Sequence, residues 1–251
     1  GWFLVTIYVA TRYLSGPGSV MPAWPFLLLA LMLTVWHGFR ILPYTKLLPK
    51  QSASTPSDVL QSHHDDPKTI RLVMSNVEME NNEYATWMQT MREADPDVLL
   101  VLEVDDSWID ATQEFIADYP HRVIEPRDNW YGMMLLSRLP IVDFNVRHLV
   151  QDDVPSIDAV IKMESGRLIR FIGVHPRPPE PIRDNDATAR DAELTLWGMK
   201  LAEEPGPVII GGDLNDIAWS QTTRLFLRTS GLLDPRRGRG FYNTFHADHW
   251  Y

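Results

Sequence analysis

The chain has 251 residues, a formal net charge of −10 and no cysteine. Without cysteine, these residues cannot form a disulfide framework, a thiolate zinc site or a thiol nucleophile. Apolar residues make up 45% of the chain and charged residues 22%, a balance that excludes a disordered chain, a collagen and a coiled coil.

The charge is unevenly distributed along the chain. The first 57 residues contain four basic residues and no acidic one, whereas the remainder contains 19 basic and 33 acidic residues. So acidic a domain is not expected to bind nucleic acid through bulk charge, because nonspecific affinity comes from Lys and Arg side chains at the phosphates. Any phosphate chemistry in this domain therefore needs a cation.

Two apolar stretches come first in the chain. Residues 24–39 contain no formally charged side chain, and with their apolar neighbours they form a segment of about 20 residues, enough for one bilayer crossing. The stretch 2–13 is too short to span a bilayer and is interpreted as the end of a helix that begins before this sequence. We therefore expect transmembrane segments within residues 1–48, the first of them partial. A buried helical hairpin of a soluble protein is the alternative. Three basic residues follow the second stretch, which favours a cytoplasmic location for the rest of the chain.

A polar, serine-rich segment separates this region from the rest of the chain. We assign residues 49–68 to a linker. The run His63-His64-Asp65-Asp66 within it has the composition of a metal-binding tract, but a solvated linker is the preferred interpretation.

Residues 69–251 alternate between strand and helix patterns, which indicates an α/β domain. In chain order we expect a strand at 69–77, a helix at 83–94, a strand at 98–102, a helix at 107–118, strands at 131–137, 141–149, 156–163 and 168–174, a helix at 184–203, a strand at 208–210, a helix at 220–229 and a short strand at 242–246.

Five polar residues end or closely follow these strands. They are Asn76, Glu103, His175, Asp213 and Asn215. In α/β sheets, ligands bind at the carboxyl ends of the strands, so these side chains are candidates for a common site. Taken singly, such residues are turn residues or helix caps more often than catalysts, but their occurrence together favours chemistry.

These residues and the motifs around them resemble the endonuclease/exonuclease/phosphatase superfamily, also called DNase I-like, and in particular a membrane-attached bacterial branch of it. The resemblance covers about residues 70–245. It implies an α/β four-layer αββα sandwich, two β-sheets face to face with helices outside, preceded here by N-terminal transmembrane helices. The matching motifs are Ser75-Asn76-Val77, Val98-Leu99-Leu100-Val101-Leu102-Glu103, Leu136-Ser137-Arg138-Leu139-Pro140-Ile141, Gly173-Val174-His175 and Gly211-Gly212-Asp213-Leu214-Asn215.

The resemblance also implies a metal site. Glu103 would be the metal carboxylate, and Asn76 beside it would orient the metal shell or the phosphate. Hard oxygen ligands without cysteine suit Mg²⁺ or Mn²⁺. The expected cofactor is therefore one of these two ions, which would offset the acidity of the domain.

Catalytic roles are implied for four residues. Asp213 would position or deprotonate the attacking water, and Asn215 would donate a hydrogen bond to a non-bridging phosphate oxygen. His175 would stabilise charge on the pentacoordinate phosphorus. Tyr131 occupies a matching strand position, where a buried aromatic residue of the core would look the same.

The end of the chain departs from the family pattern. Family members carry an Asp-His pair on a final strand after a longer loop, whereas Asp248 and His249 follow Phe245 almost at once. We expect that the true pair lies beyond Tyr251, that the chain is truncated at its C-terminus, and that this fragment is inactive.

The expected function is a metal-dependent phosphoesterase that cleaves a phosphodiester or phosphomonoester by in-line attack of an activated water. The alternatives are an endonuclease or exonuclease acting on DNA, which the acidic charge does not favour, and a catalytically silent membrane-anchored module of the same fold. The expected partners are a phosphate-ester substrate and a membrane, the bacterial inner membrane by the resemblance. The sequence carries no signal for the oligomeric state.

Overall fold

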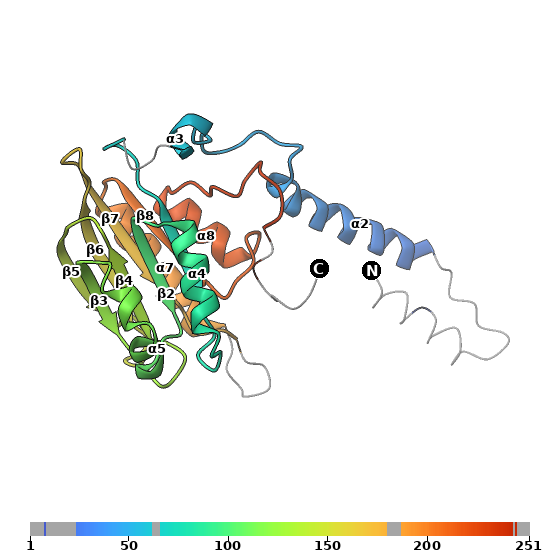
Figure 1. The fold of residues 1–251 in the computed structure, drawn as a ribbon. Coiled ribbons are helices and arrows are strands. Elements are labelled where there is room, and N and C mark those ends of the chain that lie inside the picture. Colours follow the sequence, from blue (N-terminus) through green and yellow to red (C-terminus); the bar gives the residue numbers. More distant parts are fainter. Residues whose placement is uncertain (1–7, 9–23, 62–65, 180–186, 243, 245–251) are drawn as a thin grey trace. The chain divides into compact units, whose positions relative to one another are not determined.

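A computed structural model describes residues 8, 24–61, 66–179, 187–242 and 244 (Figure 1). They group into two compact units. The first unit lies within Gly1–Ala53 together with Leu233–Tyr251, and the second is Ser54–Leu232. A segment at the C-terminal end of the chain thus joins the same unit as the apolar N-terminal region.

The first unit contains a long apolar helix, α2 (Trp24–Ile41), followed by the 3-10 turn η2 (Leu42–Tyr44). The segment from Leu27 to Tyr44 is long and apolar enough to cross a membrane. Signal sequences and the core helices of soluble proteins can have the same length and hydropathy. The large apolar side chains of α2 are mostly exposed, with Phe39 at 78%, whereas a buried hairpin would hide them. Of the other apolar stretch, 2–13, only Tyr8 lies within the described residues.

Parts of the expected linker are structured. The backbone N–H of Gln51 donates to the carbonyl of Arg237 (3.4 Å), and residues 57–61 form the short helix α3 (Ser57–Gln61). Local polarity predicted a linker, but hydrogen bonds from a segment about 190 residues away satisfy this backbone. His63, His64 and Asp65 lie outside the described residues.

The second unit is built on two four-stranded sheets. One has the order β1-β2-β4-β3, formed by β1 (Leu72–Asn76), β2 (Val98–Leu102), β3 (His121–Glu125) and β4 (Met133–Ser137). The other has the order β5-β6-β7-β8, formed by β5 (Ile141–Arg147), β6 (Ser156–Lys162), β7 (Leu168–Val174) and β8 (Val208–Gly212). In each sheet one pair is parallel, β1 with β2 and β7 with β8.

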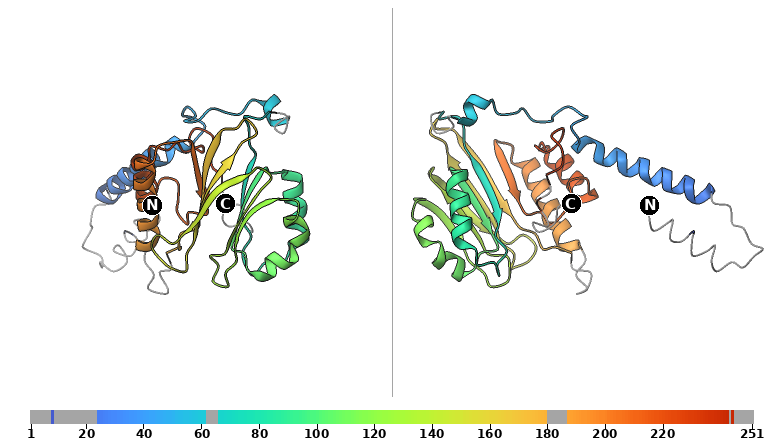
Figure 2. Two further views of the ribbon diagram at one scale, coloured as in Figure 1. Left: turned by 90° about the vertical axis from the view of Figure 1, so that its left-hand side faces the viewer. Right: turned by 45° about the vertical axis from the view of Figure 1, so that its right-hand side comes forward.

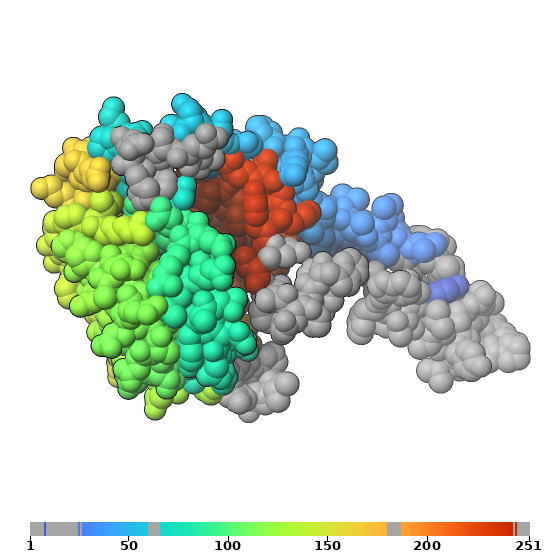
Figure 3. All heavy atoms as spheres, in the orientation of Figure 1, coloured from blue at the N-terminus to red at the C-terminus, as the bar shows by residue number. Residues whose placement is uncertain are grey.

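Helices cover the outer face of each sheet, which gives four layers (Figure 2). The helices α4 (Tyr84–Ala94), α5 (Asp106–Ala111) and α6 (Gln113–Ile116) lie on the first sheet. The helices α7 (Thr188–Glu203) and α8 (Gln221–Ser230) lie on the second. Figure 3 shows the side chains of α4 as a continuous outer surface. The predicted αββα sandwich is therefore confirmed.

Most of the elements expected within residues 69–251 are present, with three differences. The strand β3 was not predicted, because only Val123 among its five residues is buried and the alternation is weak. The helix expected at 107–118 is divided into α5 and α6 at Thr112, whose hydroxyl donates to the carbonyl of Trp108 (2.6 Å). In the strand expected at 242–246, Tyr242 and Thr244 are not in a strand, and the other three residues lie outside the described part.

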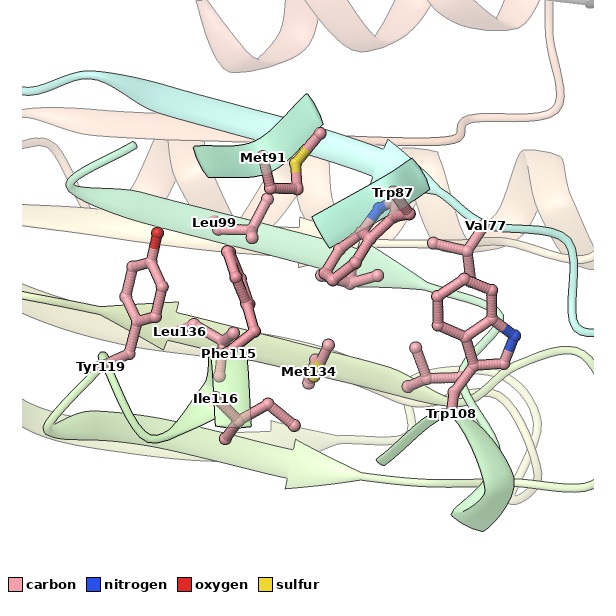
Figure 4. Close-up of a cluster of buried hydrophobic side chains, with 12 residues drawn as sticks. Val77, Trp87, Met91, Leu99, Trp108, Phe115, Ile116, Tyr119, Met134 and Leu136 are labelled. Carbon is pink, nitrogen blue, oxygen red and sulfur yellow. The ribbon is translucent and has the colours of Figure 1, made fainter. Parts of the chain in front are cut away.

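Three buried clusters fill the spaces between the layers. Between the first sheet and its helices, aromatic rings pack edge to face (Figure 4). The centroids of Trp87 and Trp108 are 5.7 Å apart and those of Trp87 and Phe115 are 5.3 Å apart. Such pairs contribute about 1 kcal/mol each beyond their burial. This rigid packing holds β1 and β2, whose ends carry two of the candidate site residues.

A buried carboxyl group on α7 gives the second sheet a pH-dependent contact. Glu193 is 4% exposed, and its Oε1 accepts a hydrogen bond from the Ser156 hydroxyl (2.7 Å). Burial raises the pKa of Glu193 to about 7, and the Ser156 bond opposes that shift. The folded state therefore holds a proton that the unfolded state releases.

We expect the variant Glu193→Gln to remove part of the pH dependence of stability. Because the folded pKa is raised from 4.5 to about 7, the stabilisation is complete below pH 4.5 and is lost as the pH rises through 7. In urea unfolding, the wild type should therefore lose about 3 kcal/mol relative to Glu193→Gln between pH 4.5 and pH 8. The exposed Glu203→Gln serves as the control and should follow the wild type. Parallel pH curves for wild type and Glu193→Gln would contradict the assignment.

Candidate active site

Four of the five strand-end residues from the sequence come together at one edge of the two sheets. Asn76 ends β1, and Glu103 follows β2, its parallel neighbour. In the other sheet, His175 follows β7 and Asp213 follows β8, again a parallel pair. Because parallel neighbours end at the same edge, each sheet contributes two side chains to the site.

Asn76 joins the two sheets. Its amide nitrogen donates to Glu103 Oε1 (2.6 Å) and to Asp213 Oδ2 (3.2 Å), a residue 137 positions away. Its amide oxygen accepts the backbone N–H of Glu78 (3.0 Å). One carboxamide therefore holds two carboxylates side by side.

The backbone at Glu103 is strained. Its φ is +65°, a region that bulky residues rarely adopt. The conformation is held by hydrogen bonds from the N–H groups of Glu103 (2.8 Å) and Val104 (3.3 Å) to the carbonyl of Gly132. Strain of this kind is retained where the surrounding structure fixes it, typically at functional sites.

The electrostatic environment of Glu103 disfavours its charge. Burial raises the pKa of Glu103, hydrogen bonds from Asn76 and from the backbone of Met79 lower it, and the negative charges of Asp213 and Glu78 raise it. Its side chain is 16% exposed. A cation at this position would relieve the repulsion between the two carboxylates.

His175 lies next to Glu103. Its Nε2 is 3.7 Å from Glu103 Oε1, its side chain is 3% exposed, and its Nδ1 is buried with no hydrogen-bond partner among the described residues. Burial lowers the pKa of His175, whereas Asp213 acts in the opposite direction. Burial is the stronger of the two effects, so the contact with Glu103 involves a neutral imidazole at pH 7 and is not an ion pair.

Tyr131 and Asn215 complete the predicted set. The ring of Tyr131, which is 7% exposed, lies 5.4 Å from the His175 ring between their centroids. Asn215, with φ +48°, donates its backbone N–H to Asp213 Oδ1 (3.0 Å) and its amide to the carbonyl of Pro176 (3.0 Å). Asn215 therefore ties Asp213 to the loop that carries His175.

Two side chains near the site were not predicted. The guanidinium of Arg177 lies 5.0 Å above the Tyr131 ring and is paired with Asp153 (2.6 Å). Trp130, which is 44% exposed and has φ +66°, donates its indole N–H to Glu80 (2.9 Å). Trp130 could have been noticed in the sequence, because it directly precedes Tyr131. The pairing of Arg177 with Asp153 and that of Trp130 with Glu80 could not, because the partners are 24 and 50 positions apart.

The donor set fits a divalent metal ion with oxygen ligands. Among the described residues no group of three or more His, Cys, Asp or Glu side chains could hold a metal by itself. Mg²⁺, however, is commonly bound by one or two carboxylates plus waters and substrate oxygens. Glu103 and Asp213 supply that number, and a bound cation would offset the burial that raises the pKa of Glu103. Asp248 and His249 lie outside the described residues.

A family model matches most of the chain. The model of the Endonuclease/Exonuclease/phosphatase family matches residues 75–251. The chain belongs to this family. Among curated proteins, none is significantly similar in sequence to the chain.

Solved structures with the same fold are distant in sequence. A β-hairpin deletion mutant of beta toxin from Staphylococcus aureus has a TM-score of 0.54 and 18% identity over 66% of this chain and 74% of its own. A humanized D. rerio TDP2 has a TM-score of 0.52 and 15% identity over 66% and 67%. Sphingomyelinase C from Streptomyces griseocarneus has a TM-score of 0.50 and 18% identity over 64% and 69%. At these identities the likeness shows the fold alone. The family match adds that the chain belongs to a family of hydrolases.

Proposed function

We propose that this chain is a metal-dependent phosphoesterase that hydrolyses a phosphodiester or a phosphomonoester by in-line attack of water. The observation that carries the proposal is the carboxamide of Asn76 between the carboxylates of Glu103 and Asp213. Such a pair, partly buried and close to a neutral imidazole, matches what phosphoryl transfer needs, since its catalysis rests on positioning and on electrostatic stabilisation.

Glu103 would hold the metal ion, with Asn76 fixing the orientation of the carboxylate. Mg²⁺ or Mn²⁺ would supply stabilisation of the negative charge that develops on the phosphoryl oxygens. The amide oxygen of Asn76 already accepts the Glu78 N–H, which supports an orienting role for this residue beside the metal carboxylate.

The attacking water would be positioned by Asp213. Its Oδ1 accepts the Asn215 N–H and its Oδ2 accepts the Asn76 amide, so the carboxylate has a fixed orientation. A fixed carboxylate can accept a proton from a water aligned with the phosphorus. The Asn215 amide has a second N–H that can donate to a non-bridging oxygen.

His175 would stabilise the pentacoordinate transition state. A neutral imidazole has one N–H donor, and in this buried position its hydrogen bond to a developing oxyanion is stronger than in water. The Tyr131 ring, itself covered by Arg177, keeps the imidazole in place by packing. Tyr131 is therefore proposed as a positioning residue.

We further propose that α2 anchors the enzyme in a membrane. Its 18 residues span about 27 Å at the helical rise of ~1.5 Å per residue, close to the ~30 Å of a bilayer core. Its exposed apolar side chains support lipid as their surroundings. A substrate at the membrane surface, such as a lipid headgroup, is favoured by this anchor and by the acidity of the catalytic domain.

A nuclease is the second candidate. A D. rerio TDP2 structure with this fold was solved with a single-strand DNA product, and the family includes endonucleases and exonucleases. A panel of plasmid DNA, abasic DNA, sphingomyelin and phosphoinositides, each with Mg²⁺, would separate the candidates. Turnover of DNA alone would favour the nuclease.

The metal requirement is the direct test of the proposed reaction. With the full-length gene product in detergent, hydrolysis of bis(p-nitrophenyl) phosphate should fall at least about a hundredfold in EDTA and return when Mg²⁺ is added in excess, because the metal contributes several kcal/mol of charge stabilisation. Thermal unfolding with and without EDTA serves as the control for structural loss. Turnover that is indifferent to EDTA would refute the proposal, and a lack of turnover with every substrate and both metals would favour a silent module.

A further inference from the structure

A cluster of basic residues surrounds the C-terminal end of α2. In the described part of the first unit, six side chains are basic and one, Asp234, is acidic. We call these six the basic cluster: Arg40, Lys46, Lys50, Arg236, Arg237 and Arg239. Half of them come from α2 and the turn after it, and half from a segment about 190 residues later.

Hydrogen bonds hold the later segment against the turn after α2. The N–H of Gly238 donates to the carbonyl of Pro43 (2.9 Å), and the N–H of Asp234 donates to Gln51 Oε1 (3.0 Å). Gly238 has φ +76°, and a Cβ there would lie 2.5 Å from the carbonyl oxygen of Pro49. The close approach of these two segments fixes three arginines beside the helix end.

Asp234, the acidic residue in the described part of this unit, is paired with a neighbouring arginine. Asp234 is 2% exposed in its side chain and accepts two hydrogen bonds from the guanidinium of Arg236, at 2.9 Å and 2.7 Å. Over residues 1–53 and 233–251, which make up this unit, the sequence has seven basic residues and two acidic ones. The cluster therefore carries a local positive charge, in contrast to the acidity of the rest of the chain.

The apolar and aromatic surroundings of the cluster match those of a membrane interface. The guanidinium of Arg40 lies 4.5 Å above the ring of Trp36, one turn back on the exposed apolar helix. Phe241 and Tyr242 are 55% and 60% exposed and line a shallow hollow with Thr45, Lys46, Arg239 and Gly240. Exposed aromatic rings next to basic side chains at the end of an apolar helix are typical of the headgroup region.

We propose that the basic cluster binds the phosphate headgroups of acidic phospholipids in the leaflet at the C-terminal end of α2. Lys46 and Arg237 attract the lipid phosphates by their positive charge, while the aromatic side chains contact the interfacial region. The inference rests on the proposed membrane anchor and is independent of the catalytic proposal. According to this proposal, the protein is bound to the membrane both by the apolar core of the bilayer and by the negative surface charge of the leaflet.

Quenching of tryptophan fluorescence by brominated lipids tests the proposal. The full-length protein in dodecyl maltoside is titrated with brominated phosphatidylglycerol or brominated phosphatidylcholine, with Trp36 next to the cluster as a reporter. The wild type should be quenched at a clearly lower mole fraction of phosphatidylglycerol than of phosphatidylcholine. For the variant Lys46→Gln/Arg237→Gln, the affinity for phosphatidylglycerol should fall about 25-fold, since each basic residue near an anionic surface contributes roughly fivefold.

Two controls separate local charge from other causes. The variant Lys162→Gln/Arg167→Gln removes the same charge from the second unit and should retain the wild-type preference. The variant Lys46→Arg/Arg237→Lys keeps the charge and should also retain it. Equal quenching by both lipids, or equal losses in both glutamine variants, would overturn the proposal.

Two further outcomes separate the ligand sources and the anchor. Loss of the phosphatidylglycerol preference in millimolar inorganic phosphate, but not in chloride at the same ionic strength, would overturn the lipid assignment in favour of a free-anion site. Absence of quenching by either lipid would overturn it together with the membrane anchor. Neither result would affect the metal-dependent activity of the catalytic domain, so the two proposals fail separately.

Discussion

Replacement of Glu103 by Gln should lower kcat/KM for a phosphodiester on the order of a thousandfold while the domain keeps or gains stability. The activity falls because the neutral amide is a poor metal ligand, and stabilisation of phosphoryl charge is worth several kcal/mol. The free energy of unfolding is expected not to fall. The raised pKa of Glu103 means that the charged carboxylate is less favourable in the folded state than in the unfolded state, and Gln removes this charge. Steady-state kinetics with Mg²⁺ and urea unfolding in EDTA measure the two effects.

The control for this experiment is Glu203→Gln, an exposed carboxylate at the end of α7. It removes the same charge from the same unit and should leave both kcat/KM and the free energy of unfolding unchanged. Asp213→Asn should resemble Glu103→Gln in activity. Wild-type turnover in Glu103→Gln would show that the carboxylate pair has another role.

Replacement of Gly212 by Ala should destabilise the second unit by about 3 kcal/mol or more and abolish activity. Gly212 has φ +144°, a conformation that L side chains rarely adopt, and a Cβ there would lie 1.9 Å from the carbonyl oxygen of Val174. Relief of this clash requires β8 to move away from β7, which displaces Asp213 and His175 together. Urea unfolding and the phosphodiester assay measure the two losses.

Gly206→Ala is the matched control for that variant. Gly206 lies just before the same strand, and nothing is within 4 Å of a Cβ at that position. The same added methyl group should change the free energy of unfolding by no more than ~0.5 kcal/mol, as is usual for surface positions. If both variants were equally stable, the close contact between β7 and β8 would not be what fixes Asp213.

Local signals in the sequence were sufficient for most of the sandwich. The strands β2 and β7 have the predicted bounds. The strand β2 is an uninterrupted apolar run, and β7 lies between the Ser165-Gly166 turn and His175. The helix α4 ends as predicted, since Asp95 takes a left-handed conformation (φ +47°) directly before Pro96. The strand β3 was missed because its only fully buried residue is Val123, so its neighbours in the sheet define it.

For the candidate site too, the sequence predicts the residues, whereas their contacts depend on the fold. Each strand-end residue could be named from the sequence, because an apolar strand that stops at a polar side chain is a local pattern. Which of them touch is not local: Asn76 meets Asp213 only because the two sheets stack with the ends of β1 and β8 at one edge. The pairing of Trp130 with Glu80 likewise depends on two loops that the fold brings together.

The sequence by itself determined the alternation of strands and helices and the polar side chains at the strand ends, which follow from short patterns of apolar and polar residues. Its motifs also resembled a family, and that resemblance implied the four layers. Only the tertiary structure decided that one carboxamide holds two carboxylates together, and that three arginines near the C-terminal end of the chain return to the end of α2. The physical reason is that such contacts depend on how layers and segments far apart in the chain pack, and no local pattern of residues records that geometry.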